Sequence, residues 1–199
     1  MALPNVATLA HIQDGSDHTF ATPSKRIHDG DDLTFFLSST AYRDLTIWLL
    51  QLNRSMFPTK SQDGRAQSST LNSPPVFSSA VSSLKTLISE LRSLVEQAPP
   101  DTGPRRFGNV AFRAWFKLAE NSIDDLLDTH LQSILTKYNS TILKDELKVY
   151  LLGSFGSAQR LDYGTGHELS FIAFLGCLWK LGMFEDGEER AIVVGVIQP

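Results

Sequence analysis

The segment Val81-Ser-Ser-Leu-Lys-Thr-Leu-Ile-Ser-Glu-Leu-Arg-Ser-Leu-Val95 decides the fold class of this chain. Its apolar residues recur at spacings of three and four, so they share one face of a helix, and polar residues fill the positions between them. Pro99 and Pro100 follow, and proline ends a helix because it lacks the N–H donor and clashes with the preceding turn. The segment therefore predicts a helix that packs its apolar stripe against other elements.

Helical spacing of apolar residues extends over most of the chain on both sides of this segment. We find no sustained alternation of apolar and polar residues, although the apolar tail Ile192–Ile197 fits a helix or a strand equally well. These patterns predict an all-α, irregular multi-helix fold. We expect further helices in 31–53, with Ser39-Thr40 as a possible break and new cap, and in 110–118, 121–138, 143–152 and 167–181.

Two stretches show no period. Residues 1–22 mix Gly, Asp, Ser and His, and we expect them to form a disordered tail. Residues 57–79 are rich in Ser, Pro, Gln and Gly, which predicts a low-complexity insertion that is a loop or disordered. The organisation we predict is therefore a tail followed by one helical domain over 23–199.

Charge and cysteine content exclude several classes of protein. The 199 residues carry 18 Lys+Arg against 22 Asp+Glu, a net charge of -4, and no basic block that could neutralise the phosphates of a nucleic acid. Cys177 is the single cysteine, so a disulfide framework is excluded and a reducing compartment is favoured. No uncharged apolar stretch reaches the ~20 residues of a membrane span. We expect a protein of the cytoplasm, with the nucleus as the alternative, that binds neither nucleic acid nor membrane.

The stretch Arg160-Leu-Asp-Tyr-Gly-Thr-Gly-His-Glu168 is the most informative for chemistry. Two glycines, a hydroxyl and a guanidinium stand just before an apolar helix, where free backbone N–H groups and the helix dipole favour an anion. The alternative interpretation is a glycine-punctuated turn in which Asp162 pairs with Arg160. For His167 and Glu168, ordinary first-turn positions are favoured over metal ligation, because no second His or Cys stands at ligand spacing.

A second segment holds the only local basic cluster, Arg105, Arg106 and Arg113. These arginines form either a solvated turn or a patch that binds a phosphate or an acidic partner surface. The aromatic residues between and after them fit a core better than a ligand-stacking surface, and Cys177 fits a buried, inert thiol. The aromatic residues in question are Phe107, Phe112, Trp115 and Phe116.

These two segments together resemble the phosphotyrosyl phosphatase activator family, which activates protein phosphatase 2A and is also classed as a peptidyl-prolyl cis-trans isomerase. The similarity lies in Arg106-Phe-Gly-Asn-Val-Ala-Phe-Arg-Ala-Trp-Phe116, in Arg160–Glu168, and in the apolar helix that follows with Phe171-Ile-Ala-Phe-Leu175 and Leu178-Trp-Lys-Leu-Gly182. The order and separation of the two blocks also match, and the resemblance covers about residues 23–194.

The resemblance implies an all-α fold of core, linker and lid around a deep cleft, where ATP binds with Mg²⁺ at the contact with the phosphatase catalytic subunit. It implies that Arg160, Thr165 and Gly166 hold the nucleotide phosphates. The implied cleft or partner-surface residues are Asp162, Tyr163, Gly164, Arg106 and Arg113.

The family pattern continues past the point where Gly195-Val-Ile-Gln-Pro199 departs from it. We therefore expect the lid, the final helices and the family's magnesium ligands to lie beyond this chain, and assign no metal ligand within it. The run His167–Leu181 is apolar on nearly all sides, which predicts a helix buried in the centre of a larger body.

Three hypotheses of function follow. In the first, the chain activates a protein phosphatase 2A type catalytic subunit through an ATP- and Mg²⁺-dependent conformational or metal-loading step. In the second, it isomerises X–Pro bonds in a proline-containing peptide segment, with catalytic residues not assigned. The alternative is a non-catalytic helical interaction module or an inactive truncated fragment.

Overall fold

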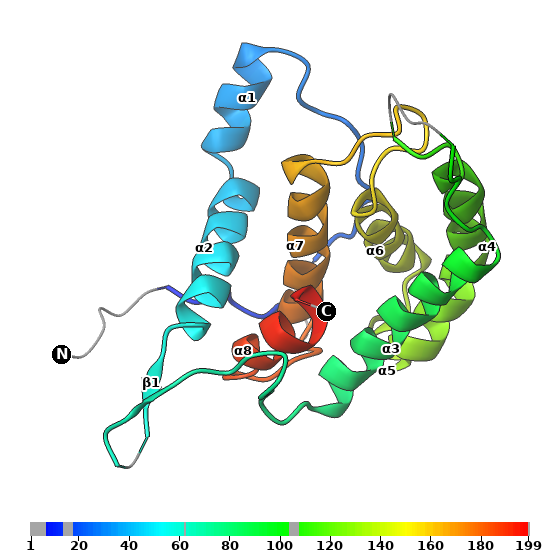
Figure 1. Cartoon of the computed structure of the whole chain (residues 1–199). Coiled ribbons are helices and arrows are strands. Elements are labelled where there is room, and N and C mark those ends of the chain that lie inside the picture. The colour runs from blue at the N-terminus through cyan, green and yellow to red at the C-terminus, as the bar shows by residue number, and fades with distance from the viewer. Residues whose placement is uncertain (1–6, 14–17, 62, 104–107, 199) are drawn as a thin grey trace. The chain divides into compact units, whose positions relative to one another are not determined.

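The computed structural model describes residues 7–13, 18–61, 63–103 and 108–198, and its regular secondary structure is almost entirely helical (Figure 1). The prediction of an all-α fold is confirmed. Two short antiparallel strands, β1 (Thr59–Lys60) and β2 (Ala66–Gln67), pair with Thr59 opposite Gln67. The helices are α1 (Gly30–Leu37), α2 (Thr40–Ser55), α3 (Ser79–Ser93), α4 (Phe112–His130), α5 (Gln132–Tyr138), α6 (Thr141–Gly153), α7 (Thr165–Lys180) and α8 (Glu189–Ile192), with a 3₁₀ turn η1 (Leu94–Glu96) and a π turn η2 (Val193–Ile197).

The predicted break at Ser39 is present and separates α1 from α2. Ser39 has an extended backbone, and its hydroxyl accepts a hydrogen bond from the Tyr42 N–H at 3.2 Å, which is the geometry of a helix N-cap. The tail that fitted a helix or a strand is helical, as α8 and η2. Between α2 and α3 the chain forms only the short β1–β2 hairpin and an isolated bridge between Thr70 and Ser73 among its described residues.

The chain divides into two compact units, each with its own core. The first comprises Met1–Ser16, Ser24–Ser82 and Leu178–Pro199. Its core contains Trp48 of α2 and Trp179 at the end of α7, whose ring centroids lie 5.0 Å apart, and both side chains are fully buried. Helix α8 packs against α2 in this unit.

Part of the predicted disordered tail lies on this first core. Leu9 is buried, its N–H donates to Gln51 Oε1 at 2.8 Å, and its carbonyl accepts from Trp179 Nε1 at 2.8 Å. The Ile12 N–H donates to the carbonyl of Lys180 at 2.6 Å. We call residues 7–12 the strap. Backbone hydrogen bonds need no periodic side-chain pattern, which is why the sequence did not predict the strap.

The second unit comprises Asp17–Pro23 and Ser83–Cys177. Within it α4 packs against α5, α6 and η1. Its centre is a set of buried aliphatic side chains, and the indole of Trp115 is anchored there by donating from Nε1 to the Leu91 carbonyl at 3.1 Å. The central aliphatic residues are Leu87, Leu91, Ile123, Leu127, Leu131, Leu147 and Leu151.

Helix α7 differs from the predicted helix that is buried all round. Phe174, Leu175, Leu178 and Trp179 in its second half are buried, whereas its first turn is exposed and Leu169 is 45% exposed. The first turn carries the polar residues of the informative stretch, and these remain in contact with solvent. Among the described residues, no helix has both the length and the apolar character required to cross a membrane.

Candidate functional site

The informative stretch folds as a tight turn that leads into α7. The Ser157 N–H donates to the Asp162 carbonyl at 3.0 Å, and the Leu161 N–H donates to the Ser157 carbonyl at 2.7 Å. The backbone φ angle of Leu161 is 56°, in the left-handed region that bulky residues rarely adopt, and that of Gly156 is 117°. The turn is therefore held in a conformation that its surroundings must support.

That support comes from the first family-like block, about fifty positions earlier in the chain. Arg113 donates from Nε to the Ala158 carbonyl at 2.9 Å and from Nη2 to the Gln159 carbonyl at 3.2 Å. A Cβ on Gly108 would lie 2.2 Å from the carbonyl oxygen of Leu161, so only glycine lets the two segments approach this closely. The two blocks that carry the family resemblance therefore meet in space.

Arg160 and Asp162 form an exposed ion pair at the tip of the turn. Arg160 Nε donates to Asp162 Oδ2 at 2.7 Å, and the side chains are 67% and 51% exposed. This hydrogen bond lowers the pKa of Asp162 and raises that of Arg160. The pairing matches the alternative interpretation of the sequence. It also fixes the guanidinium, whose Nη groups have no hydrogen-bond partner in the part of the chain that the structure describes.

His167 connects the turn to the end of α6. Its Nδ1 lies 2.6 Å from the carbonyl of Gly153, and because a carbonyl only accepts, Nδ1 carries the donated proton. Its Nε2 lies 3.9 Å from Asp162 Oδ1, and the ring of Tyr163 stacks on the imidazole with centroids 5.7 Å apart. His167 therefore has the ordinary structural role favoured by the sequence.

The first turn of α7 provides the predicted helix start. Thr165 and Gly166 are exposed, and the first N–H groups of any helix lack intrahelical acceptors. A Cβ added at Gly164 or Gly166 would meet nothing within 4 Å, so space is open beside both residues. Among the predicted site residues, Arg106 lies outside the described part of the chain, and the structure does not test its role.

An apolar groove of about 280 Å³ lies beside this turn in the second unit. No sequence pattern indicates this groove, because its lining comes from three separate segments. Phe112 lines it and stacks on the buried Trp115 with centroids 5.5 Å apart, so the expected core role fits Trp115, whereas Phe112 is only half-buried. The lining residues used below are Val95, Pro100, Phe112, Trp115 and Phe155.

The described residues contain no group of three His, Cys, Asp or Glu side chains arranged to hold a metal ion. Asp162 is engaged by Arg160, and Asp124 and Asp128 of the second unit are paired with lysines. Lys144 Nζ lies 2.7 Å from Asp128, and Lys148 Nζ lies 2.6 Å from Asp124.

Comparison with known proteins shows one family. The model of the phosphotyrosyl phosphate activator (PTPA) protein family matches residues 23–199. The serine/threonine-protein phosphatase 2A activator 1 of Aspergillus fumigatus is 52% identical over 201 residues, which cover 96% of this chain and 42% of that protein. The activator of the same name from Emericella nidulans is 49% identical over 209 residues, covering 100% and 48%.

A solved structure agrees with these matches. The crystal structure of the PP2A phosphatase activator Ypa1 PTPA1 superimposes with a TM-score of 0.75 at 32% identity, covering 94% of this chain and 56% of that chain. The chain spans less than half of the length of the two fungal relatives.

Proposed function

This chain belongs to the PTPA family, and from that membership we propose that it activates a protein phosphatase 2A type catalytic subunit. The observation that carries the proposal is the contact between its two family blocks, in which Arg113 and Gly108 hold the turn of Arg160 in place. We propose that it acts in a reducing compartment, the cytoplasm or the nucleus, because its single cysteine cannot form a disulfide within the chain.

We propose further that the turn binds the phosphates of ATP. Asp162 holds Arg160 through Nε, which leaves the Nη edge of the guanidinium for a bidentate contact with a phosphate. The exposed N–H groups of Thr165 and Gly166 would provide further donors at the positive end of α7. The bound nucleotide would supply a polyanion at the contact with the phosphatase.

The described residues offer no group of three His, Cys, Asp or Glu side chains that could hold magnesium, so we propose no magnesium ligand among them. Any magnesium at this turn would arrive on the phosphates of the nucleotide.

The test is a phosphatase assay with a purified catalytic subunit, a phosphopeptide, ATP and Mg²⁺. We expect the wild-type chain to raise the activity. Arg160→Ala should weaken nucleotide binding by roughly tenfold or more, since a hydrogen bond to a charged group contributes ~1.5–3 kcal/mol. Arg92→Ala removes an exposed arginine of α3 in the same unit but outside the turn, so it is the matched control and should activate normally. A folded chain that leaves the phosphatase activity unchanged would refute the proposal.

A second candidate, peptidyl-prolyl isomerisation, is favoured by the apolar groove. A proline ring would pack on the apolar lining that includes Phe112 and Phe155, and an apolar environment that desolvates the X–Pro amide would lower its rotation barrier of ~18–20 kcal/mol. In a protease-coupled peptide assay we expect Phe112→Ala to slow the catalysed rate. Phe171→Ala, on α7 outside the groove, should not. A wild-type rate equal to the uncatalysed background would eliminate this candidate.

A further inference from the structure

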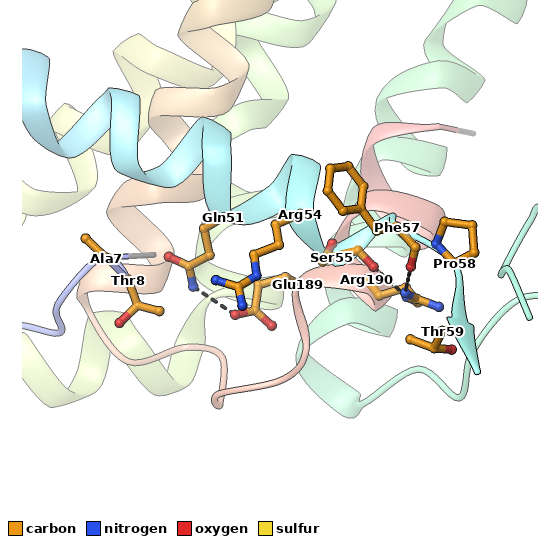
Figure 2. Close-up of a pocket in the computed structure, with 10 residues that line it drawn as sticks. All are labelled: Ala7, Thr8, Gln51, Arg54, Ser55, Phe57, Pro58, Thr59, Glu189 and Arg190. Atoms are coloured by element: carbon orange, nitrogen blue, oxygen red, sulfur yellow. Dashed lines mark hydrogen bonds between the residues drawn. The ribbon is translucent and has the colours of Figure 1, made fainter. Parts of the chain in front are cut away.

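A second cavity lies in the first unit, separate from the turn and from the apolar groove. Its volume is about 450 Å³, within the range of ~300–1,000 Å³ typical of small-molecule sites. The strap, the end of α2, the segment that follows it and the start of α8 form its walls. Figure 2 shows the labelled side chains arranged in a row, from Ala7 and Thr8 at one end to Pro58 and Thr59 at the other.

Arg190 is fixed at one end of this cavity. Its Nε donates to the Ser55 carbonyl and its Nη2 to the Phe57 carbonyl, both at 2.7 Å. Both bonds leave from the same edge of the guanidinium. Its other edge, between Nη1 and Nη2, has no further hydrogen-bond partner within the described residues, and this edge has the fork geometry that matches a carboxylate or a phosphate. Because the side chain is already immobilised, a ligand would bind it without ordering it.

The opposite part of the wall is also held in place. Gln51 is only 6% exposed, its Oε1 accepts from the Leu9 N–H at 2.8 Å, and its Nε2 donates to Glu189 Oε1 at 2.8 Å. The charged residues that line the cavity are Arg54 and Arg190 against Glu189. Positive charge therefore exceeds negative charge here, in a chain whose net charge is -4.

The remaining wall is apolar. Phe57 is 48% exposed beside Pro58, although a large aromatic side chain is normally buried. A flat apolar group on a ligand would cover this surface while an anionic group met Arg190. The cavity thus combines one oriented guanidinium, an excess of positive charge and an apolar face.

We propose that this cavity binds a small organic oxyanion, in which a carboxylate or a phosphate contacts Arg190 and an apolar body covers Phe57 and Pro58. Arg54 adds to the positive potential, and Glu189 weakens it. The site belongs to the first unit, and the proposal does not depend on nucleotide binding at Arg160.

Titration calorimetry of the full chain tests this with phenyl phosphate, benzoate, inorganic phosphate and neutral benzyl alcohol. We expect at least one aromatic anion to bind, and to bind more tightly than inorganic phosphate and benzyl alcohol. The better of the two anions identifies the preferred oxyanion. In an NMR spectrum the Nε–H resonance of Arg190 should shift on binding. Failure of both anions to bind, or equal binding of benzyl alcohol, would overturn the proposal.

Two substitutions of charged residues should change the affinity for the anion in opposite directions. Both leave Arg190 and its hydrogen bonds to Ser55 and Phe57 intact. Removal of one charge at a partly solvated site changes affinity by roughly three- to tenfold, so Arg54→Gln should weaken binding and Glu189→Gln should tighten it by that order. Arg43→Gln, on the same helix but outside the cavity, and Arg160→Ala should leave the affinity unchanged. Unchanged affinity in both cavity variants, or an equal loss with Arg160→Ala, would contradict this assignment.

Discussion

At the scale of single residues, the exposed Arg160–Asp162 pair should have a measurable effect on the pKa of the Asp162 carboxyl. The hydrogen bond from Arg160 holds the pKa of Asp162 below its ordinary value of 3.8. In Arg160→Gln the pKa of Asp162 should rise toward that value, as measured by NMR titration of the side-chain carboxyl. An unchanged pKa would show that the pair does not form in solution.

The sign of the accompanying effect on stability follows from the lowered pKa. A carboxyl whose pKa is lower in the folded chain adds stability above its unfolded pKa, and this is lost as the pH falls through the folded pKa. Asp162 and Arg160 are both exposed, so solvent screens the pair. The Arg160→Gln variant should therefore unfold at nearly the same urea concentration as the wild type at neutral pH.

Gly108 provides a second prediction at this scale. In Gly108→Ala the new Cβ would lie 2.2 Å from the Leu161 carbonyl oxygen. That oxygen belongs to the backbone and cannot rotate away as a side chain could, so the turn must move. We expect a loss of stability of ~1–3 kcal/mol in urea unfolding, together with weaker nucleotide binding. Gly164→Ala, with open space around its Cβ, is the control and should change stability by much less. Equal stability of the two variants would contradict the close approach.

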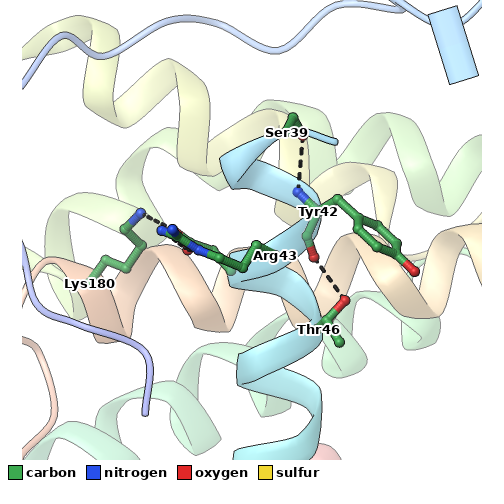
Figure 3. A network of polar contacts seen from close by, with 6 residues as sticks. Ser39, Tyr42, Arg43, Thr46 and Lys180 are labelled. Atoms are coloured by element: carbon green, nitrogen blue, oxygen red, sulfur yellow. Dashed lines mark hydrogen bonds and ion pairs between the residues drawn. The ribbon is translucent and has the colours of Figure 1, made fainter. Parts of the chain in front are cut away.

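At the scale of helices, Lys180 at the end of α7 is tied to α2. Lys180 Nζ donates to Asp44 Oδ2 at 2.7 Å, and Arg43 donates to the same carboxylate. Figure 3 shows Lys180 pointing toward Arg43 in this network. The side chains of Asp44 and Lys180 are 16% and 32% exposed. Burial alone would raise the pKa of Asp44, but the hydrogen bonds from Lys180 and Arg43 lower it overall. This pair is thus less screened than the one at Arg160.

Lys180→Met should therefore lower the free energy of unfolding by ~1–2 kcal/mol at neutral pH, because it removes a hydrogen bond between charged groups. The pKa of Asp44 is below its ordinary value, so the difference from wild type should disappear as the pH falls through the folded pKa. Arg43→Gln is the control, since Arg43 is 67% exposed and should contribute little. Denaturant unfolding at neutral and acidic pH measures the free energy of unfolding of the wild type and the two variants. A loss of stability in Lys180→Met that is the same at both pH values would argue against the ion pair.

The helices also show what the sequence could predict. The break at Ser39 was predictable because a cap is local, with the hydroxyl bonded to an N–H three residues ahead. The Arg160–Asp162 pair was foreseen for the same reason. The two bonds from Arg113 to the turn span 45 and 46 positions, and no spacing rule predicts which carbonyls such an arginine reaches. The two blocks were identified from the sequence by the family resemblance, whereas their contact is visible only in the structure.

At the scale of the whole molecule, the candidate sites are distributed over the two units. The turn of Arg160 and the apolar groove belong to the second unit, and the cavity of Arg190 belongs to the first. The sequence pointed only to the turn, because its residues are contiguous. The other two sites are assembled from segments far apart in the chain, so composition and periodicity gave no signal for them. The role of the turn in nucleotide binding stays a prediction.

The strap gives the prediction that belongs to this scale, because it joins the beginning of the chain to the first core. Leu9 is 4% exposed, and both its N–H and its carbonyl are bonded to that core. Leu9→Ala keeps the backbone bonds but removes buried methyl groups, so we expect a loss of ~2–5 kcal/mol in the free energy of unfolding. Thr8→Ala is the neighbouring control, since Thr8 is exposed.

Tryptophan fluorescence during urea unfolding measures this effect in the unit that contains the strap. Trp48 and Trp179 both belong to the first unit, and Trp115 belongs to the second, so a Trp115→Phe background leaves reporters only where the strap lies. In that background Leu9→Ala should unfold at a clearly lower urea concentration than Thr8→Ala. If the two variants unfold together, residues 7–12 are not part of the core in solution, and the original expectation of a disordered tail would hold for them.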